Sequence, residues 1–251
     1  MKYFFLFIVS ISTLSANAKT SDNCFYTKLI NNYSEYSISG YRCTDKNVVI
    51  PSVINGYSVT AIEESAFRML DIQSVKFPDT ITSIGPWAFE KNQITQVNLP
   101  PKLKYIGQAA FIQNKLTHVT IPDTLTELSL ITFAGNEIVT VKLHDRMTGI
   151  SIGAFAGNKI KNISIPKSVT DIGNSAFADN QIEVITIPGN VVTIRDHAFE
   201  NNAIQNLILE KGIEFIGHYT FSNNKLSSIK IPDSVTYVGP QAFDSSVSVI
   251  K

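Results

Sequence analysis

The 251-residue sequence lacks a net charge, since its 21 basic side chains balance 21 acidic ones, and it has only two cysteines and one tryptophan. Charge balance without clusters of Lys and Arg is atypical of proteins that bind nucleic acid or an anionic membrane. No long apolar run follows Tyr3–Ile11, so we expect no membrane insertion by the mature chain. Apolar residues still make up 44% of the sequence, which argues against disorder.

Catalytic and metal-binding motifs are also missing. The sequence contains no nucleophile elbow, phosphate loop, HExxH pair or EF-hand loop. Asp79, Asp123, Asp145 and Asp233 share one position of the repeat described below, but Pro, Lys and Gly interrupt this row. So few carboxylates do not supply the oxygen ligands that calcium needs. We therefore predict a protein that is not an enzyme and that has no cofactor and no metal site.

The N-terminus has the pattern of a cleavable signal peptide. Lys2 precedes the apolar run Tyr3–Ile11, and Ala16 and Ala18 form a cleavage pattern of small residues. A membrane anchor would need roughly 20 apolar residues, more than this run provides. We predict that residues 1–18 are a signal peptide and that the mature protein is secreted, periplasmic or on the cell surface.

Export places the two cysteines in an oxidising compartment, where they can form one bridge. Between Cys24 and Cys43 lie two alternating apolar runs around the pair Asn31-Asn32, a pattern typical of a β-hairpin. A metal or redox site is the alternative, but CxxC spacing is absent. We predict a Cys24–Cys43 disulfide within a capping hairpin at residues 19–49, with Phe25 and Tyr26 on its apolar side. Closing a loop of about 20 residues would contribute roughly 3 kcal/mol.

Phenylalanine recurs at a constant interval of 22 residues through the rest of the chain. The nine positions are Phe67, Phe89, Phe111, Phe133, Phe155, Phe177, Phe199, Phe221 and Phe243. A small residue precedes each Phe, Asn follows three positions later in seven units, and Pro follows eleven positions later in six. Such a unit cannot bury its apolar residues alone and must stack on its neighbours.

Each position of the unit has a physical interpretation. The aliphatic residues at plus 8 and plus 10 alternate with polar ones, which predicts a short strand with one buried face. Pro ends the strand because it has no N–H to donate. Gly at four before Phe indicates a tight corner, which we expect to lead into a single helical or 3₁₀ turn. Asn at plus 3 predicts a structural ladder that satisfies buried backbone groups.

The frame "IxxVxLPxxLxxIGxxAFxxN" closely resembles the leucine-rich repeat of the BspA-like class. This resemblance implies a β-rich, right-handed solenoid of nine Phe-marked units at residues 50–251, with the hairpin as a cap. It also implies a recognition or adhesion surface on an exported or cell-surface protein, and it carries over no catalytic residues. Ser129, Ser151 and Arg195 replace the corner Gly, and His144 and Glu210 replace Pro.

The concave strand face, at plus 7 and plus 9, is the first candidate site. It is mostly small and polar, so ordinary solvated sheet surface is the alternative interpretation. Val184 and Ile208 break the polar rule, and an apolar centre with a polar rim is typical of protein-binding patches. We predict a protein partner there, and a glycan-binding module is the alternative function. The candidate residues are Thr140, Lys142, Asn162, Val184, Asn206, Ile208 and Lys230.

Two further surfaces are candidates for contacts. The first is a patch of apolar residues at the Phe-side turns of the central units, namely Ile112, Leu130, Ile131 and Ile152. The alternative is that these turns fold inward where Gly is missing. The second is the C-terminal edge, where Val247 and Ile250 are expected at the strand positions and the edge either frays or associates with a second molecule.

Overall fold

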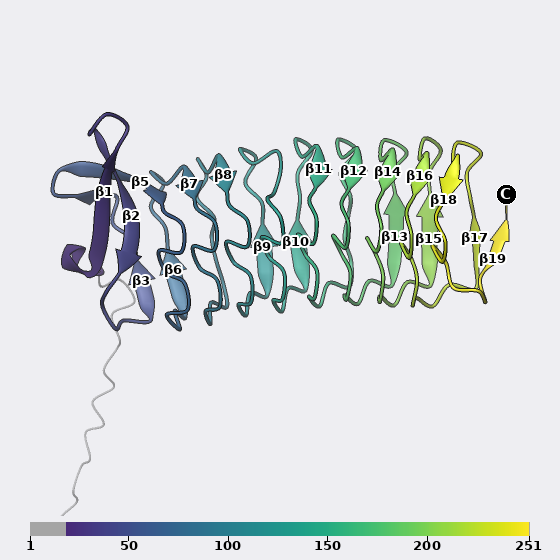
Figure 1. The fold of residues 1–251 in the computed structure, drawn as a ribbon, viewed down its shortest axis with the longest axis horizontal. Coiled ribbons are helices and arrows are strands. Elements are labelled where there is room, and N and C mark those ends of the chain that lie inside the picture. Colours follow the sequence, from purple (N-terminus) through teal and green to yellow (C-terminus); the bar gives the residue numbers. More distant parts are fainter. Residues whose placement is uncertain (1–18, 251) are drawn as a thin grey trace, which may run out of the picture.

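The computed structural model describes residues 19–250, which form one row of stacked coils behind an N-terminal cap. Figure 1 shows the cap at one end of the row and the C-terminus at the other. The predicted signal peptide, residues 1–18, lies outside the described residues. The repeat therefore produces the predicted solenoid of stacked coils.

The regular elements are short, because each coil of 22 residues contains two extended sides and two corners. They are η1 (Asp22–Cys24), β1 (Phe25–Ile30), β2 (Glu35–Tyr41), β3 (Asn47–Val49), β4 (Val53–Ile54), β5 (Tyr57–Ile62), β6 (Ser74–Lys76), β7 (Ser83–Ile84), β8 (Tyr105–Ile106), β9 (His118–Thr120), β10 (Thr140–Lys142), β11 (Gly149–Ile150), β12 (Asp171–Ile172), β13 (Val184–Ile187), β14 (Thr193–Ile194), β15 (Asn206–Leu209), β16 (Phe215–Ile216), β17 (Ser228–Lys230), β18 (Tyr237–Val238) and β19 (Ser248–Ile250).

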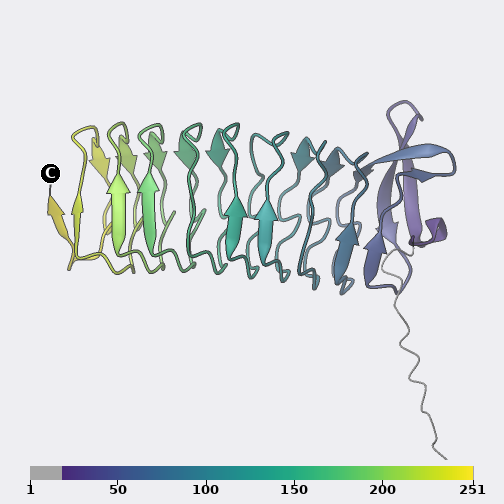
Figure 2. The ribbon, with the colours of Figure 1, turned by 180° about the vertical axis from the view of Figure 1, so that it is seen from behind.

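The strands form two parallel ladders on opposite sides of the row (Figures 1 and 2). One ladder, which contains β3, β6, β9, β10, β13, β15, β17 and β19, pairs only in twos. The other contains β5, β7 and β8 in one sheet and β11, β12, β14, β16 and β18 in a second. Units in register bring equivalent residues together, as Ile185 pairs with Leu207.

The nine repeated phenylalanines form a continuous column inside the row. Neighbouring rings are stacked with centroids 4.9 to 5.8 Å apart. Phe67 to Phe221 are fully buried, and their stacking explains the constant spacing of the sequence. The two distances around Phe133 are both 5.8 Å, the largest in the column.

The repeated asparagines form the predicted structural ladder. Asn158 is typical: its side-chain amide donates to the carbonyls of Phe133 and Phe155, and its carbonyl oxygen accepts the N–H of Ile138. One side chain thus pairs groups from two consecutive coils. This satisfies backbone groups that a buried corner would otherwise leave without partners.

The Phe-side corner differs from the expected helical or 3₁₀ turn. Among residues 19–250 the only helical segment is η1, and the corners are turns with i to i+3 hydrogen bonds, as from Ala88 N–H to the Gly85 carbonyl. Residues two before Phe adopt a left-handed conformation, with φ of 52° at Trp87 and 47° at Ile131. A left-handed residue reverses the chain within one turn, so no helix forms.

Corner Gly residues are required for the close approach of coils, and their own conformation is ordinary. A Cβ on Gly173 would lie 2.7 Å from the backbone nitrogen of Ile152 in the preceding coil. Ser129 and Ser151 carry a Cβ at this position, and their hydroxyls donate to carbonyls of the preceding coil. These two units contain Phe133 and Phe155, where the rings are most widely spaced.

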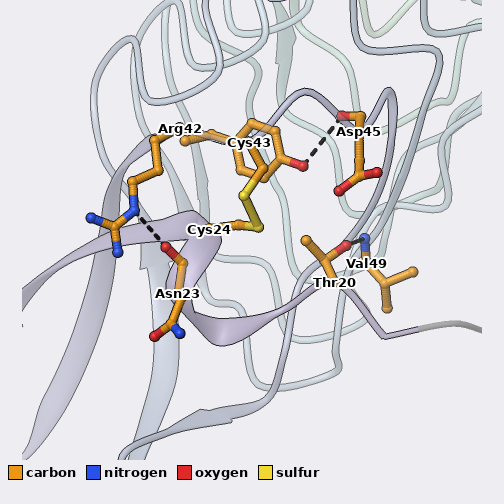
Figure 3. The surroundings of a disulfide bond; sticks show 8 residues. Thr20, Asn23, Cys24, Arg42, Cys43, Asp45 and Val49 are labelled. Carbon is orange, nitrogen blue, oxygen red and sulfur yellow. Dashed lines mark hydrogen bonds between the residues drawn. A yellow bond between two sulfur atoms is a disulfide. The ribbon is translucent and has the colours of Figure 1, made fainter.

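The N-terminal cap is the predicted disulfide-closed hairpin. β1 and β2 are antiparallel, and Cys24 is bonded to Cys43 (Figure 3). Phe25, Ile38 and Tyr41 are buried against the first coil, and the Tyr41 ring lies 5.5 Å from that of Phe67. Burial, together with the nearby Asp45 carboxylate, raises the pKa of Tyr41.

Two details of the cap differ from the prediction. Tyr26 does not contact the first coil, because it is 52% exposed beneath the guanidinium of Arg42. The parallel ladder also begins before residue 50. Its first strand, β3, lies inside the segment predicted as cap and pairs with β6 of the next coil. The Val49 N–H donates to the hydroxyl of Thr20, which links the segment before η1 to this first ladder strand (Figure 3).

The C-terminal strand has another register than predicted. In β19, Val249 stands opposite Ile229, so Val249 takes the plus-8 position that was expected for Ile250. All three residues of β19 are exposed, and among residues 19–250 this strand pairs only with β17. The Asp244 carboxylate accepts the N–H groups of Asn223 and Asn224 in the preceding coil, and Ser246 stands at the Asn position of the last unit.

Candidate functional site

The ladder from β6 to β17 presents a continuous outer surface, which we call the strand face. Each of its strands alternates exposed and buried residues, so the residues at plus 7 and plus 9 point outward. These outward positions carry Lys76, Lys142 and Lys230 but no acidic residue and no Phe, Tyr or Trp. The strand face is therefore polar with a basic bias.

All seven residues predicted for the partner site are exposed on the strand face. Thr140 and Lys142 lie on β10, Val184 on β13, Asn206 and Ile208 on β15, and Lys230 on β17. Asn162 lies in a coil whose side is not assigned as a strand. The structure thus places these residues on one surface, spread along five consecutive coils.

Val184 and Ile208 are diagonal neighbours. Val184 stands opposite Asn206, and Ile208 stands opposite Thr186, two residues further along the strands. Their side chains are 47% and 58% exposed, which is high for aliphatic residues. Lys161 and Glu183, at plus 6 of neighbouring coils, share a backbone hydrogen bond, and among the described residues they form no salt bridge.

The strand face is interrupted by breaks that the sequence does not reveal. β6 and β9, β10 and β13, and β15 and β17 are not paired with each other. Three hollows lie at such breaks, of about 560 Å³ between Gln96 and His118, about 320 Å³ beside Val184, and about 300 Å³ beside Ile208. Hollows with apolar floors are where a ligand can displace water most favourably.

Four residues that were not predicted from the sequence line these hollows. Lys211 and Pro232 flank the hollow at Ile208, and Lys167 and Pro188 flank the one at Val184. The sequence did hold a signal next to Lys211, because Glu210 in "LEKG" at 209–212 replaces the usual Pro.

The second candidate patch is also exposed. Leu130 and Ile152 are 41% and 46% exposed, and Ile112 and Ile131 are half-buried. The alternative, in which these turns fold inward, is not what the structure shows. Leu130 and Ile152 occupy the same position of consecutive coils, so the patch is contiguous across the corner.

Charges elsewhere on the molecule are paired or isolated. Arg195 donates through Nε to both carboxylate oxygens of Asp171, each at 3.0 Å, and this contact raises the pKa of the guanidinium. Within residues 19–250 no group of three His, Cys, Asp or Glu side chains is arranged to hold a metal ion. In the same range, no helix is long and apolar enough to cross a bilayer.

Comparison with known proteins identifies the class and the family. The two ladders, the Phe column and the Asn ladder define a leucine-rich-repeat β-solenoid. The model of the BspA type leucine rich repeat region matches residues 36–159 and 126–250. The chain therefore belongs to the BspA-type leucine-rich repeat family. No curated protein matches it.

Several solved structures share the fold. A leucine-rich repeat protein of T. pallidum is 21% identical with a TM-score of 0.59, over 92% of this chain and 100% of that one. The pneumococcal vaccine antigen PcpA is 14% identical with a TM-score of 0.60, over 90% and 80%. A leucine rich cell surface protein of Faecalibacterium prausnitzii A2-165 is 22% identical with a TM-score of 0.52, over 92% and 87%. At these identities the likeness concerns the fold.

Proposed function

We propose that this protein is an exported, non-enzymatic recognition protein that binds a protein partner through the strand face. The observation that carries the proposal is the pair Val184 and Ile208, which expose aliphatic side chains in the middle of a rigid polar sheet. An apolar centre inside a polar rim is typical of protein-binding surfaces. A rigid ladder also loses little conformational entropy when a partner binds.

Export is supported by the disulfide and by the leader pattern of residues 1–18. Structural disulfides persist in oxidising compartments and are rare in the cytosol. The similar proteins include one described as a cell surface protein and one described as a vaccine antigen. Adhesion at a cell surface is consistent with these observations, and we include it in the proposal.

Glycan binding is the alternative function, and the strand face argues against it. Its outward positions hold no aromatic side chain on which a sugar ring could stack. Enzymatic activity is argued against by the family and fold and by the scattering of the four histidines over different positions of the repeat.

The proposal is tested by quantitative capture with residues 19–251 immobilised and cell-surface extracts as the source of partners. We expect the double substitution Val184→Ser with Ile208→Ser to reduce capture at least about tenfold, since it removes the apolar centre. Val192→Ser is the matched control, because Val192 is 40% exposed in the same unit as Val184 but on the opposite ladder.

Treatment of the extract separates the two functions. Protease digestion should abolish capture, whereas enzymatic removal of glycans should leave it intact. Capture that survives protease but not deglycosylation would favour the glycan-binding module. Capture by the double variant at the wild-type level would place the site off the strand face and contradict the proposal.

Self-association at the C-terminal edge stays a separate prediction. The exposed β19 has one unpaired edge within the described chain, and such edges can pair with another strand.

A further inference from the structure

The hollow beside Ile208 lies at a break in the ladder. β15 pairs with β13 and β17 pairs with β19, and no backbone hydrogen bond joins β15 to β17 within residues 19–250. Figure 1 shows the two strands next to each other near the C-terminal end of the row. Where no backbone hydrogen bonds join these two strands, a hollow of about 300 Å³ opens on the strand face.

The hollow has an apolar floor and one apolar wall. Leu207 and Leu209 point inward and are 9% and 7% exposed, so only their outer atoms reach the hollow. Ile208 stands between them and is 58% exposed, and half-buried Pro232 closes the other side. An aliphatic or aromatic side chain that entered this space would cover Ile208 and exclude water from the floor.

Two lysines flank the same hollow. Lys230 extends from β17 and Lys211 from the corner after β15, and neither forms a salt bridge within the described chain. Their neighbours in sequence, Glu210 and Asp233, are acidic, but neither forms a salt bridge within the described chain: Glu210 accepts the N–H of Gly189, and Asp233 is exposed. The charge of a matching ligand is therefore negative.

The corner that carries Lys211 is fixed by its neighbours. A Cβ on Gly189 would overlap the carbonyl oxygen of Lys211, so the two coils touch through backbone. Gly212 N–H donates to the Ser234 hydroxyl at 2.9 Å, and this hydroxyl donates to the Ile213 carbonyl at 2.8 Å. The position of the Lys211 backbone is thus set before any ligand arrives, which lowers the entropic cost of binding.

The hollow beside Val184, two coils away, has a similar apolar lining and one lysine. Ile163, Ile165 and Pro188 contribute apolar walls, and Lys167 stands at the same repeat position as Lys211. Glu210 also lines this hollow, and its carboxylate accepts the N–H of Gly189. At about 4.8 Å per strand, two coils correspond to about 10 Å, the length of about three residues of extended chain. A small carboxylic acid cannot occupy both hollows, but a peptide segment running along the row can.

We infer that the strand face recognises an acidic, extended segment of a protein partner, which places apolar side chains in the hollows beside Ile208 and Val184. Its carboxylates lie against Lys211, Lys230 and Lys167. This inference rests on the proposed function and gives the chemistry of its partner. Lysine stands at plus 12 only in the units that carry Lys167 and Lys211, whereas the other units have Asp, Pro or Gly at this position.

The test uses a random twelve-residue peptide library displayed on phage and selected on residues 19–251. We expect selected peptides to be enriched in Asp and Glu and to contain two apolar residues about three positions apart. Measured by fluorescence anisotropy, a selected peptide should bind Lys211→Glu with Lys230→Glu at least about tenfold more weakly, and replacing its acids by amides should have a similar effect.

Lys225→Glu is the matched control, because Lys225 is exposed in the same unit as Lys230 but lies outside the hollow. Its binding should stay within about twofold of wild type. Melting curves of all variants show whether charge reversal disturbs folding. If it does, Lys230→Gln, which removes the charge without reversing it, provides the milder variant for the binding measurement. Affinity should also fall with rising salt concentration.

The inference is overturned if the library yields no binders, if binders lack an acidic bias, or if charge reversal leaves affinity unchanged. It is also overturned if octanoate binds in the hollow but does not compete with any selected peptide, which would make this a small-molecule site. Capture that depends on Val184 and Ile208 but not on Lys211 and Lys230 would leave the proposed function standing. Capture that does not depend on Val184 and Ile208 would contradict both the proposed function and this inference.

Discussion

At the scale of single residues, the asparagine at plus 3 connects sequence to stability most directly. Its side chain has two donors and an acceptor, and all three have backbone partners in a buried corner. Any other residue of similar size would leave at least one of these groups without a partner. This explains why seven units keep Asn while their surface positions vary freely.

The substitution Asn158→Ala tests this argument. Asn158 is 6% exposed, and its loss leaves the buried Ile138 N–H unpaired and removes one of the two amide donors from each of the Phe133 and Phe155 carbonyls, so we expect about 3 kcal/mol of destabilisation in urea unfolding. Asn174→Ala is the control, since Asn174 is exposed and only its backbone carbonyl is bonded. Equal midpoints for the two variants would show that the ladder contributes no net stability.

At the scale of elements, the cap protects the open end of the Phe column. Solenoids expose apolar core at their ends unless another element covers it. Here the rings of Phe25 and Tyr41 contact Phe67, with centroids 6.4 and 5.5 Å away, and so continue the column into the hairpin. The disulfide closes the hairpin over a sequence separation of 19 residues.

Removing the bridge should therefore loosen the cap first. We expect Cys24→Ser with Cys43→Ser to cost about 3 kcal/mol, as the chain-entropy model gives for a loop of this length. Hydrogen exchange should speed up in β1 and β2 but not in β13 and β15, because each coil contacts mainly its neighbours. Unchanged exchange in the hairpin would mean that the buried rings alone hold the cap.

At the scale of the whole molecule, the sequence predicted what repeats and missed what varies between repeats. The spacing of Phe predicted the solenoid, and the pair of cysteines predicted the bridge. The left-handed corner residues were missed because Trp87 and Ile131 are not residue types associated with positive φ. The breaks in the ladder were missed because equivalent residues recur in every unit whether or not their strands pair.

The candidate sites show the same division. Alternation along a strand was enough to place Val184 and Ile208 on the outer face, because the side-chain period of a strand is two residues. Their diagonal relation depends on the register of β13 and β15, which composition does not encode. The hollow beside Ile208 needed the structure, since its walls come from two units whose strands β15 and β17 do not pair with each other.

The corner patch offers the last prediction. Because Leu130 and Ile152 are already 41% and 46% exposed, Leu130→Asp with Ile152→Asp should change the free energy of unfolding by less than about 1 kcal/mol. Ile150→Asp is the contrasting variant: Ile150 is 1% exposed, so a buried charge there should unfold the coil. Because we place the partner on the strand face, the double corner variant should also capture partner at the wild-type level. A sharp fall in melting temperature would mean that these turns contribute to the core after all, and loss of capture with unchanged melting would move the partner site to the corner.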